Sequence, residues 1–145
     1  MPFERFSRVR NIAQAIFANE FSCFDQKDAL FVDIAMPQVS ISYICASASN
    51  VSGESTYINC RIHTDSNEIW IRSIRVASSF QGQGLGRQLA QAAEAIARCF
   101  NIDVIKIMPL TSSLEFWRKL GYTPEPHAAR VMSKILTDVA TVADV

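Results

Sequence analysis

Residues 80–87 read Phe80-Gln81-Gly82-Gln83-Gly84-Leu85-Gly86-Arg87, and the hydrophobic pattern of the chain changes across them. Before this segment apolar residues alternate in the manner of half-buried strands, and after it they recur on one face of a helix, from Gly84 to Phe100. Three glycines in five residues leave the main-chain N–H groups open to a ligand. The N-terminus of the helix adds its positive dipole end. The segment therefore predicts a seat for an anion with several oxygens, such as a pyrophosphate.

Two common phosphate-binding motifs do not fit this segment. A dinucleotide fingerprint needs a third glycine three residues after the second, but Arg87 stands three residues after Gly84 and Leu89 three after Gly86. A P-loop needs a lysine directly after its last glycine, and none follows here. A tight strand-to-helix turn alone would need fewer glycines, because each one costs chain entropy.

The rest of the chain predicts a small α+β domain. Short links between the first four expected strands favour an antiparallel meander, and only the strand–loop–helix–strand unit needs a parallel crossover. The expected elements, in chain order, are a helix at about 6–20, strands at 30–35, 39–46, 56–62 and 69–76, a helix at 84–100, a strand at 103–108, a helix at 112–120, and a hairpin of 122–125 with 131–136.

Composition narrows the class of protein. The 145 residues are 49% hydrophobic, which suits a single domain over 1–145, with 137–145 as an aperiodic, flexible tail. Fourteen basic residues balance fourteen acidic ones, so bulk attraction to nucleic acid is not expected. No window approaches a membrane span and the N-terminus lacks a secretory pattern, so a cytoplasmic protein is expected. The four cysteines show no metal-ligand spacing; they are expected to be reduced and packed, with no metal site.

Two motifs resemble those of the GNAT acetyltransferase family. The family signature has Arg or Gln, two residues, Gly, one residue, then Gly or Ala, directly after a strand that ends in valine. Gln81, Gly84 and Gly86 match it, and Val76 matches the strand end. Downstream, Phe116-Trp117-Arg118-Lys119-Leu120-Gly121-Tyr122 resembles the helix-to-strand segment of the family. The resemblance covers about residues 69–136 and implies a GNAT-like fold, with a central, mostly antiparallel mixed sheet and helices on both faces.

The resemblance also implies a site for acetyl-CoA. In the family two strands splay apart around the pantetheine arm, which places its hydrogen bonds here on the backbone of Ile74 and Val76. The pyrophosphate would lie on the amides of Gln81, Gly82, Gln83, Gly84, Leu85, Gly86 and Arg87. The Arg87 side chain is either a further phosphate ligand or a solvated residue of the first helical turn. Trp117 either lies near the thioester or packs in the core.

The implied activity is transfer of an acetyl group from acetyl-CoA to a primary amine of a small molecule, polyamine, peptide N-terminus or lysine. The sequence departs from the family pattern: Trp117 stands at the usual tyrosine acid, Arg72 at a frequent glutamate and Leu110 at a common asparagine. Catalytic residues therefore stay unknown, with Glu68, Tyr43 and Ser113 as candidates. Arg72 would favour an acceptor that carries a carboxylate or phosphate, unless it faces solvent.

Three functions remain open at this point: the acetyltransferase, a non-catalytic acyl-CoA-binding module that regulates a partner, and a nucleotide-phosphate binder of another fold. The two departures at Trp117 and Arg72 support the second function, and the failed fingerprints disfavour the third. Members of the family often dimerise, so a homodimer is one expectation.

Overall fold

In the computed structural model, residues 5–49 and 53–136 are described. The expected tail at 137–145 lies outside this range, as does part of the polar connection before Gly53.

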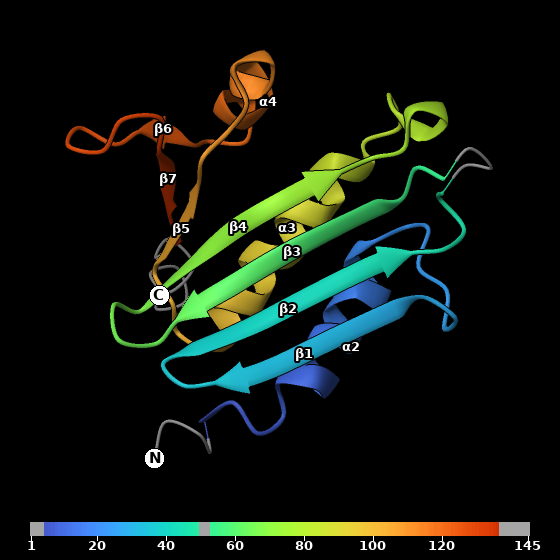
Figure 1. Ribbon diagram of the computed structural model, residues 1–145, viewed down its shortest axis with the longest axis horizontal. Helices are drawn as coiled ribbons and strands as arrows, with labels where there is room; N and C mark the ends of the chain where they lie inside the picture. The colour runs from blue at the N-terminus through green and yellow to red at the C-terminus, as the bar shows by residue number, and fades with distance from the viewer. Residues whose placement is uncertain (1–4, 50–52, 137–145) are drawn as a thin grey trace, which may run out of the picture.

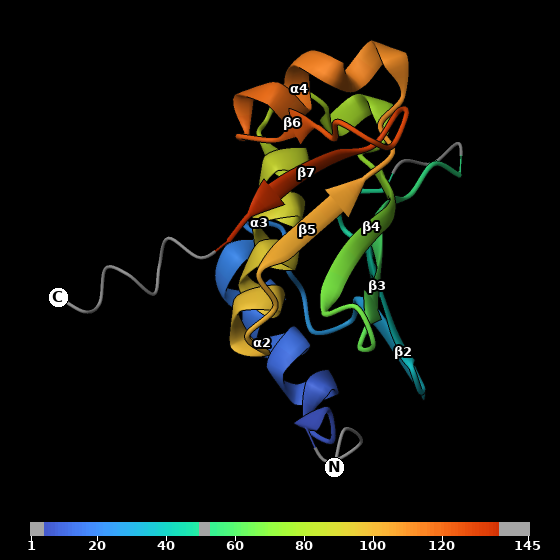
Figure 2. The ribbon, with the colours of Figure 1, turned by 90° about the vertical axis from the view of Figure 1, so that its left-hand side faces the viewer.

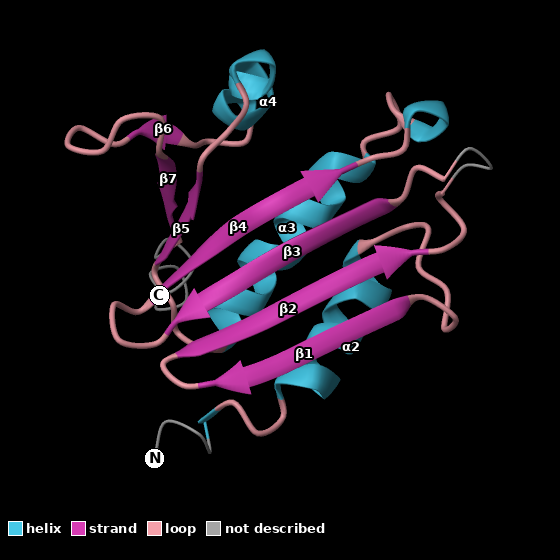
Figure 3. Cartoon of the chain, in the orientation of Figure 1, coloured by secondary structure: helices cyan, strands magenta, loops and turns pink. Residues whose placement is uncertain are grey.

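Seven strands form one open mixed sheet in the order β1-β2-β3-β4-β5-β7-β6. Strands β1 to β4 make an antiparallel meander, β4 and β5 run parallel, and β7 is antiparallel to both β5 and β6 (Figure 3). The predicted fold class is confirmed. The strand bounds are β1 Ala29–Ala35, β2 Gln38–Cys45, β3 Thr56–His63, β4 Glu68–Arg75, β5 Val104–Ile107, β6 Thr123–Pro124 and β7 Met132–Ile135.

Three α-helices are described: α2 (Val9–Glu20), α3 (Leu85–Cys99) and α4 (Leu114–Lys119). Single 3-10 turns precede the last two, at Ser78–Phe80 and Thr111–Ser113. Where the resemblance implied helices on both faces, α2 and α3 lie side by side behind β1–β4, on one face (Figure 1). The short α4 lies at the far end of the molecule, beside β6 (Figure 2).

The core lies between the meander and the two long helices. Buried and half-buried residues alternate along β2 and β3, so one face of each strand is turned inward. Helix α3 supplies the facing stripe, which includes Leu89, Ala93 and Ile96, all with no exposed area. The other face of the meander is more open, and Phe31 on it is 59% exposed.

Strands β4 and β5 separate half-way along β4. Their parallel pairing runs only from Glu68 with Val104 to Ile71 with Ile107. Strand β4 continues to Arg75 in pairing with β3, across an irregularity in register that leaves Arg72 without a β3 partner. The fork that results is the fold's one opening between parallel strands in the described part of the chain, and it was expected from the resemblance.

No helix within 5–49 and 53–136 has the length and apolar character needed to cross a bilayer. All four cysteines are free thiols; Cys45 and Cys60 are buried as expected, but Cys99 is exposed, since it ends α3 on its solvent side.

Candidate functional site

The glycine segment forms an open loop that leads into α3. Gly82 and Gly84 have φ angles of 85° and 80°, a left-handed conformation that disfavours residues with a side chain. A Cβ atom at either position would meet nothing within 4 Å, so the space above the loop is free. Gly84 is the N-cap of α3, and the first N–H groups of the helix have no partner within it. Bare amides therefore face an open space at the positive end of a 15-residue helix.

A cavity of about 440 Å³ lies over this loop. Two cations line it, Arg87 from the first turn of α3 and Lys119 from the end of α4, and no acid does so among the described residues. Gly86 lets the helices come close, because a Cβ atom there would already lie 3.4 Å from the Phe116 ring. The cavity is thus suited in charge and shape to a polyanion. We call it the phosphate groove.

A second, larger cavity of about 730 Å³ occupies the fork between β4 and β5, and we call it the fork cleft. The two cavities share Val76, Gln81, Gly86 and Phe116, so they adjoin, and we call the two together the channel. The remaining lining of the fork cleft is largely apolar or hydroxylic, apart from Arg72 and Arg75. An elongated ligand with an anionic end and a less polar arm matches this arrangement.

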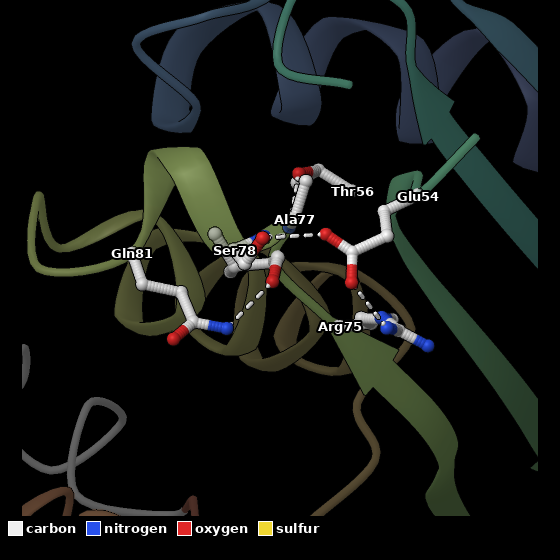
Figure 4. A network of polar contacts seen from close by, with 7 residues as sticks. Glu54, Thr56, Arg75, Ala77, Ser78 and Gln81 are labelled. Carbon is white, nitrogen blue, oxygen red and sulfur yellow. Dashed lines mark hydrogen bonds and ion pairs between the residues drawn. The ribbon is translucent and has the colours of Figure 1, made fainter. Parts of the chain in front are cut away.

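A polar network holds the start of the loop against Thr56, the first residue of β3, and Glu54, which precedes that strand (Figure 4). The Glu54 carboxylate accepts hydrogen bonds from the Ser78 amide at 3.0 Å and hydroxyl at 2.7 Å, and pairs with Arg75 at 2.9 Å. The buried Thr56 hydroxyl accepts from the Ala77 amide at 2.9 Å and donates to the Ala48 carbonyl. These bonds fix where β4 ends and the loop begins.

Most of the predicted ligand-binding residues come together in this channel. Gln83 belongs to the loop but lines neither cavity. The Gln81 side chain donates to the Val76 carbonyl at 3.0 Å, across the mouth of the loop. The phosphate groove holds Gly82, Gly84, Leu85 and Arg87, the fork cleft holds Ile74, Arg72, Ser113 and Trp117, and both hold Val76, Gln81 and Gly86.

Trp117 combines the two roles between which the sequence left a choice. Its side chain is 2% exposed and packs edge-on against Phe116 and Tyr122, at centroid distances of 4.9 and 5.0 Å. It is thus a core residue that also lines the fork cleft.

Two of the three catalytic candidates, Glu68 and Tyr43, lie outside the lining of the fork cleft. Glu68, at the start of β4, accepts a hydrogen bond from Trp70 and pairs with Lys106, each at 2.9 Å. Burial alone would raise the pKa of Glu68, but the bonds from Trp70 and Lys106 outweigh it, so the pKa is lowered. A carboxylate held in this way, about 13 Å along the strand from Arg72, does not reach the fork cleft.

Tyr43 is buried under α2, stacked on Phe17 at 4.2 Å, and donates to Asp28. Burial and the neighbouring Asp28 carboxylate raise the pKa of Tyr43 far above its usual value. Its hydroxyl therefore has a structural role, as the donor to Asp28. Ser113 does line the fork cleft, but its hydroxyl donates to the Leu110 carbonyl at 2.9 Å.

Phe116, Lys119 and Tyr57 are among the lining residues that were not singled out as site residues in the sequence. Phe116 and Lys119 stand in the second family-like motif, and their spacing from Gly121 could have indicated them. Tyr57 lines the fork cleft from β3, opposite Arg75. No local pattern marks Tyr57, because its place in the cleft follows from strand register.

The model of the acetyltransferase (GNAT) family matches residues 14–122 of the chain. Among solved structures, Elp3 of the archaeon Methanocaldococcus infernus, with an N-terminal deletion, is 22% identical with a TM-score of 0.58, over 76% of this chain and 30% of that one. Tetrahymena GCN5 is 12% identical with a TM-score of 0.54, over 91% and 89% of the two chains. An acetyltransferase from Bacillus cereus is 19% identical with a TM-score of 0.54, over 87% and 89%.

The chain thus spans less than a third of the length of the Elp3 chain that it matches. At these identities the structural likeness shows the fold alone. Among curated proteins, none matches the chain.

Proposed function

The chain belongs to the GNAT acetyltransferase family, and from that premise we propose that it transfers an acetyl group from acetyl-CoA to a primary amine. The observation that carries the proposal is the pair of adjoining cavities, one over the glycine loop and one in the fork between β4 and β5. The cavity over the loop is cationic and suits the diphosphate of acetyl-CoA, and the cavity in the fork is less polar and suits the pantetheine arm.

The phosphate groove fits a diphosphate. The unpaired amides at the start of α3 would donate hydrogen bonds to its oxygens, and Arg87 and Lys119 would supply compensating charge. No Asp or Glu, which would repel a polyanion, is among the described residues that line this groove. The amides and Arg87 are predicted from the sequence, and Lys119 joins the proposal because it lines the same groove.

The fork cleft fits the pantetheine arm and the acetyl group. Beyond Ile71, β4 has no partner strand on its β5 side, so its backbone groups at that edge are free to bond an extended ligand. The predicted contacts at Ile74 and Val76 lie in this stretch, and both residues line the cleft. The Gln81 amide now bonded to Val76 would have to release that carbonyl when the arm binds.

Acetyl-CoA, when bound, supplies an acetyl group activated as a thioester. The residues of the fork cleft would hold the acceptor amine against it, and positioning of this kind can contribute about 7–11 kcal/mol to a reaction between two bound partners. Within the described lining of the cleft there is no Asp, Glu or His that could take the amine proton. The part assigned to this chain is therefore orientation of the two reactants, with proton loss to solvent.

The same lining favours a second function, a non-catalytic acyl-CoA-binding module. The two functions differ in turnover: an acetyltransferase releases free CoA thiol in the presence of a suitable amine, whereas a binding module does not. A panel of amines incubated with acetyl-CoA and a thiol reagent separates them.

Binding of acetyl-CoA is tested by calorimetry on the wild type and on Lys119→Glu. Lys119 is exposed, so the change should leave the fold intact while placing a negative charge in the phosphate groove. We expect affinity to fall at least about tenfold, since a hydrogen bond to a charged group contributes about 1.5–3 kcal/mol. Gly84→Glu is less suitable, because its positive φ strains any side chain.

The matched control is Arg8→Glu, which makes the same change in net charge at an exposed position beside α2, outside the channel. It should bind acetyl-CoA like the wild type. A wild-type protein without measurable affinity for acetyl-CoA would refute the proposal, and equal losses in the two variants would remove the phosphate groove from it.

A further inference from the structure

The fork cleft carries an uncompensated positive charge. Two arginines, Arg72 and Arg75, are the charged groups in its described lining. Arg75 is neutralised by Glu54 at 2.9 Å (Figure 4). The Arg72 side chain is exposed and makes no hydrogen bond or ion pair with the rest of the described chain. Within the described lining of the cleft, Arg72 is therefore the charged side chain without a partner.

The backbone explains why Arg72 lies in the cleft. The parallel pairing of β4 with β5 ends at Ile71, and Arg72 is the next residue. The register of β4 against β3 also shifts here, so that Cys60 pairs with Ile71 and Asn59 with Ser73. Arg72 is thus unpaired on both sides, at the point where the two strands diverge. A guanidinium in this position can form two parallel hydrogen bonds to a carboxylate or a phosphate.

The lining also limits how basic the acceptor amine can be. No carboxylate or imidazole of the described chain lines the fork cleft, so the amine must arrive partly neutral. A lysine-type amine, with a pKa of about 10.4, is neutral in about one molecule in 2,500 at pH 7. An α-amino group, with a pKa of about 7.7–8.0, is neutral in roughly a tenth of molecules or more. A site that only positions the amine therefore accelerates the reaction of an α-amino group far more than that of a lysine-type amine.

We infer that the acceptor is a weakly basic primary amine, such as an α-amino group, that carries a carboxylate or phosphate bound by Arg72. The inference rests on the proposed acetyltransferase function and names the substrate class. The amine nitrogen attacks the thioester carbonyl carbon, a C–N bond forms and the C–S bond breaks. The products are an acetamide and the CoA thiol, with the amine proton passing through solvent to the thiolate. Polyamines and lysine side chains fit the cleft poorly, because Arg72 repels their charge.

A set of capped dipeptides tests the charge requirement at constant amine basicity. Ala-Glu-amide, Ala-Gln-amide and Ala-Lys-amide share an N-terminal α-amino group and differ in the charge of one side chain. We expect kcat/KM to be at least tenfold higher for Ala-Glu-amide than for Ala-Gln-amide, and lowest for Ala-Lys-amide. Ala-phosphoserine-amide shows whether phosphate is preferred to carboxylate. A longer peptide that begins Ala-Glu separates a peptide N-terminus from a small molecule as the source of the amine.

Nα-acetyl-lysine tests the requirement for low basicity, since it has a carboxylate but a strongly basic amine. We expect its kcat/KM to be at least a hundredfold below that of Ala-Glu-amide at pH 7. Comparable values for the two compounds would overturn this part of the inference.

Arg72→Gln should abolish the preference for Ala-Glu-amide over Ala-Gln-amide, and Arg72→Lys should keep part of it. Arg118→Gln is the matched control, because Arg118 is 54% exposed on α4, pairs with Glu115 and does not line the fork cleft. It should leave the preference unchanged. Calorimetry should show that Arg72→Gln still binds acetyl-CoA, because the phosphate groove is untouched.

The outcomes separate this inference from the proposed function. If the wild type binds acetyl-CoA and acetylates the three capped dipeptides at equal rates, the acetyltransferase stands and the anionic acceptor is wrong. If Arg72→Gln keeps the preference, Arg72 is not the anion-binding residue. If acetyl-CoA binds but no amine is acetylated, or if it does not bind at all, the proposed function and the inference both fail.

Discussion

At the scale of single residues, Glu68 shows how neighbouring donors can give a carboxylate a structural role in place of a catalytic one. It stands on the strand where the family resemblance suggested a base, yet Lys106 and Trp70 occupy both of its oxygens. The Glu68 side chain is 20% exposed, so the pair with Lys106 is partly shielded from water. The pair has a structural role that joins β4 to β5 just below the fork.

We therefore expect Glu68→Gln to leave kcat/KM within about twofold of the wild type and to lower the free energy of unfolding at pH 7 by about 1 kcal/mol. The pKa of Glu68 is lowered in the fold relative to about 4.3 in the unfolded chain. Its stabilising effect is thus present above pH 4.3 and is lost as pH falls through the folded value. Urea unfolding at pH 7 and at pH 3 should show the difference between wild type and variant shrinking with acid.

Glu115→Gln serves as the control for this pair. Glu115 is 69% exposed and lies 3.5 Å from Arg118, so its loss should change stability by a few tenths of a kcal/mol at most. A large loss of activity in Glu68→Gln, with stability retained, would restore Glu68 as a catalytic candidate.

At the scale of elements, the junction between β4 and the glycine loop depends on one hydroxyl from β3. Thr56 is fully buried, and its Oγ1 links the Ala77 amide to the Ala48 carbonyl. The loop conformation is therefore specified from outside the loop, by a strand that precedes it by some twenty residues. Both of its partners are backbone groups that would be left without a hydrogen bond if the hydroxyl were removed.

Thr56→Val keeps the shape of the side chain and removes only that bonding. We expect the free energy of unfolding to fall by about 2–3 kcal/mol, because two buried backbone groups lose their partner. Affinity for acetyl-CoA should also fall several-fold, since the loop is no longer held at Ala77. Thr56→Ser retains the hydroxyl and should recover most of the affinity. Equal stability of Thr56→Val and the wild type, measured by urea unfolding, would show that the hydroxyl does not anchor the junction.

At the scale of the whole molecule, local patterns predicted most elements within a residue or two. Strand β2 was expected at 39–46 and lies at Gln38–Cys45, because alternation of apolar and polar side chains is a property of the strand itself. The first helix was expected from residue 6 but begins at Val9. Phe6 precedes the helix and is nevertheless fully buried, so the apolar pattern of the sequence extends beyond the N-terminus of the helix. The glycine loop was predicted from its composition alone.

Contacts between distant segments were not predictable in this way. Lys106 meets Glu68 only because β5 lies parallel to β4 in one register, and Tyr57 lines the cleft because it pairs with Arg75. Both facts depend on sheet register, which no short motif of this chain records. The same reason explains why Glu68 and Tyr43 were placed in the site and Tyr57 was not.

Helix α3 and the C-terminal hairpin are joined through the buried side chain of Glu94, which accepts hydrogen bonds from Tyr122 at 2.9 Å and Lys134 at 3.1 Å. Glu94→Ala leaves those two donors unpaired, and we expect the free energy of unfolding to fall by about 3 kcal/mol. Glu94→Gln, which keeps an acceptor and the volume, should lose less.

The two tryptophans report on the two parts, Trp70 on the meander and Trp117 beside Tyr122. In Trp70→Phe and Trp117→Phe backgrounds, Glu94→Ala should shift the remaining fluorescence transition equally, because one linked core unfolds as a unit. A shift confined to the Trp117 signal would mean that the hairpin unfolds independently of α3.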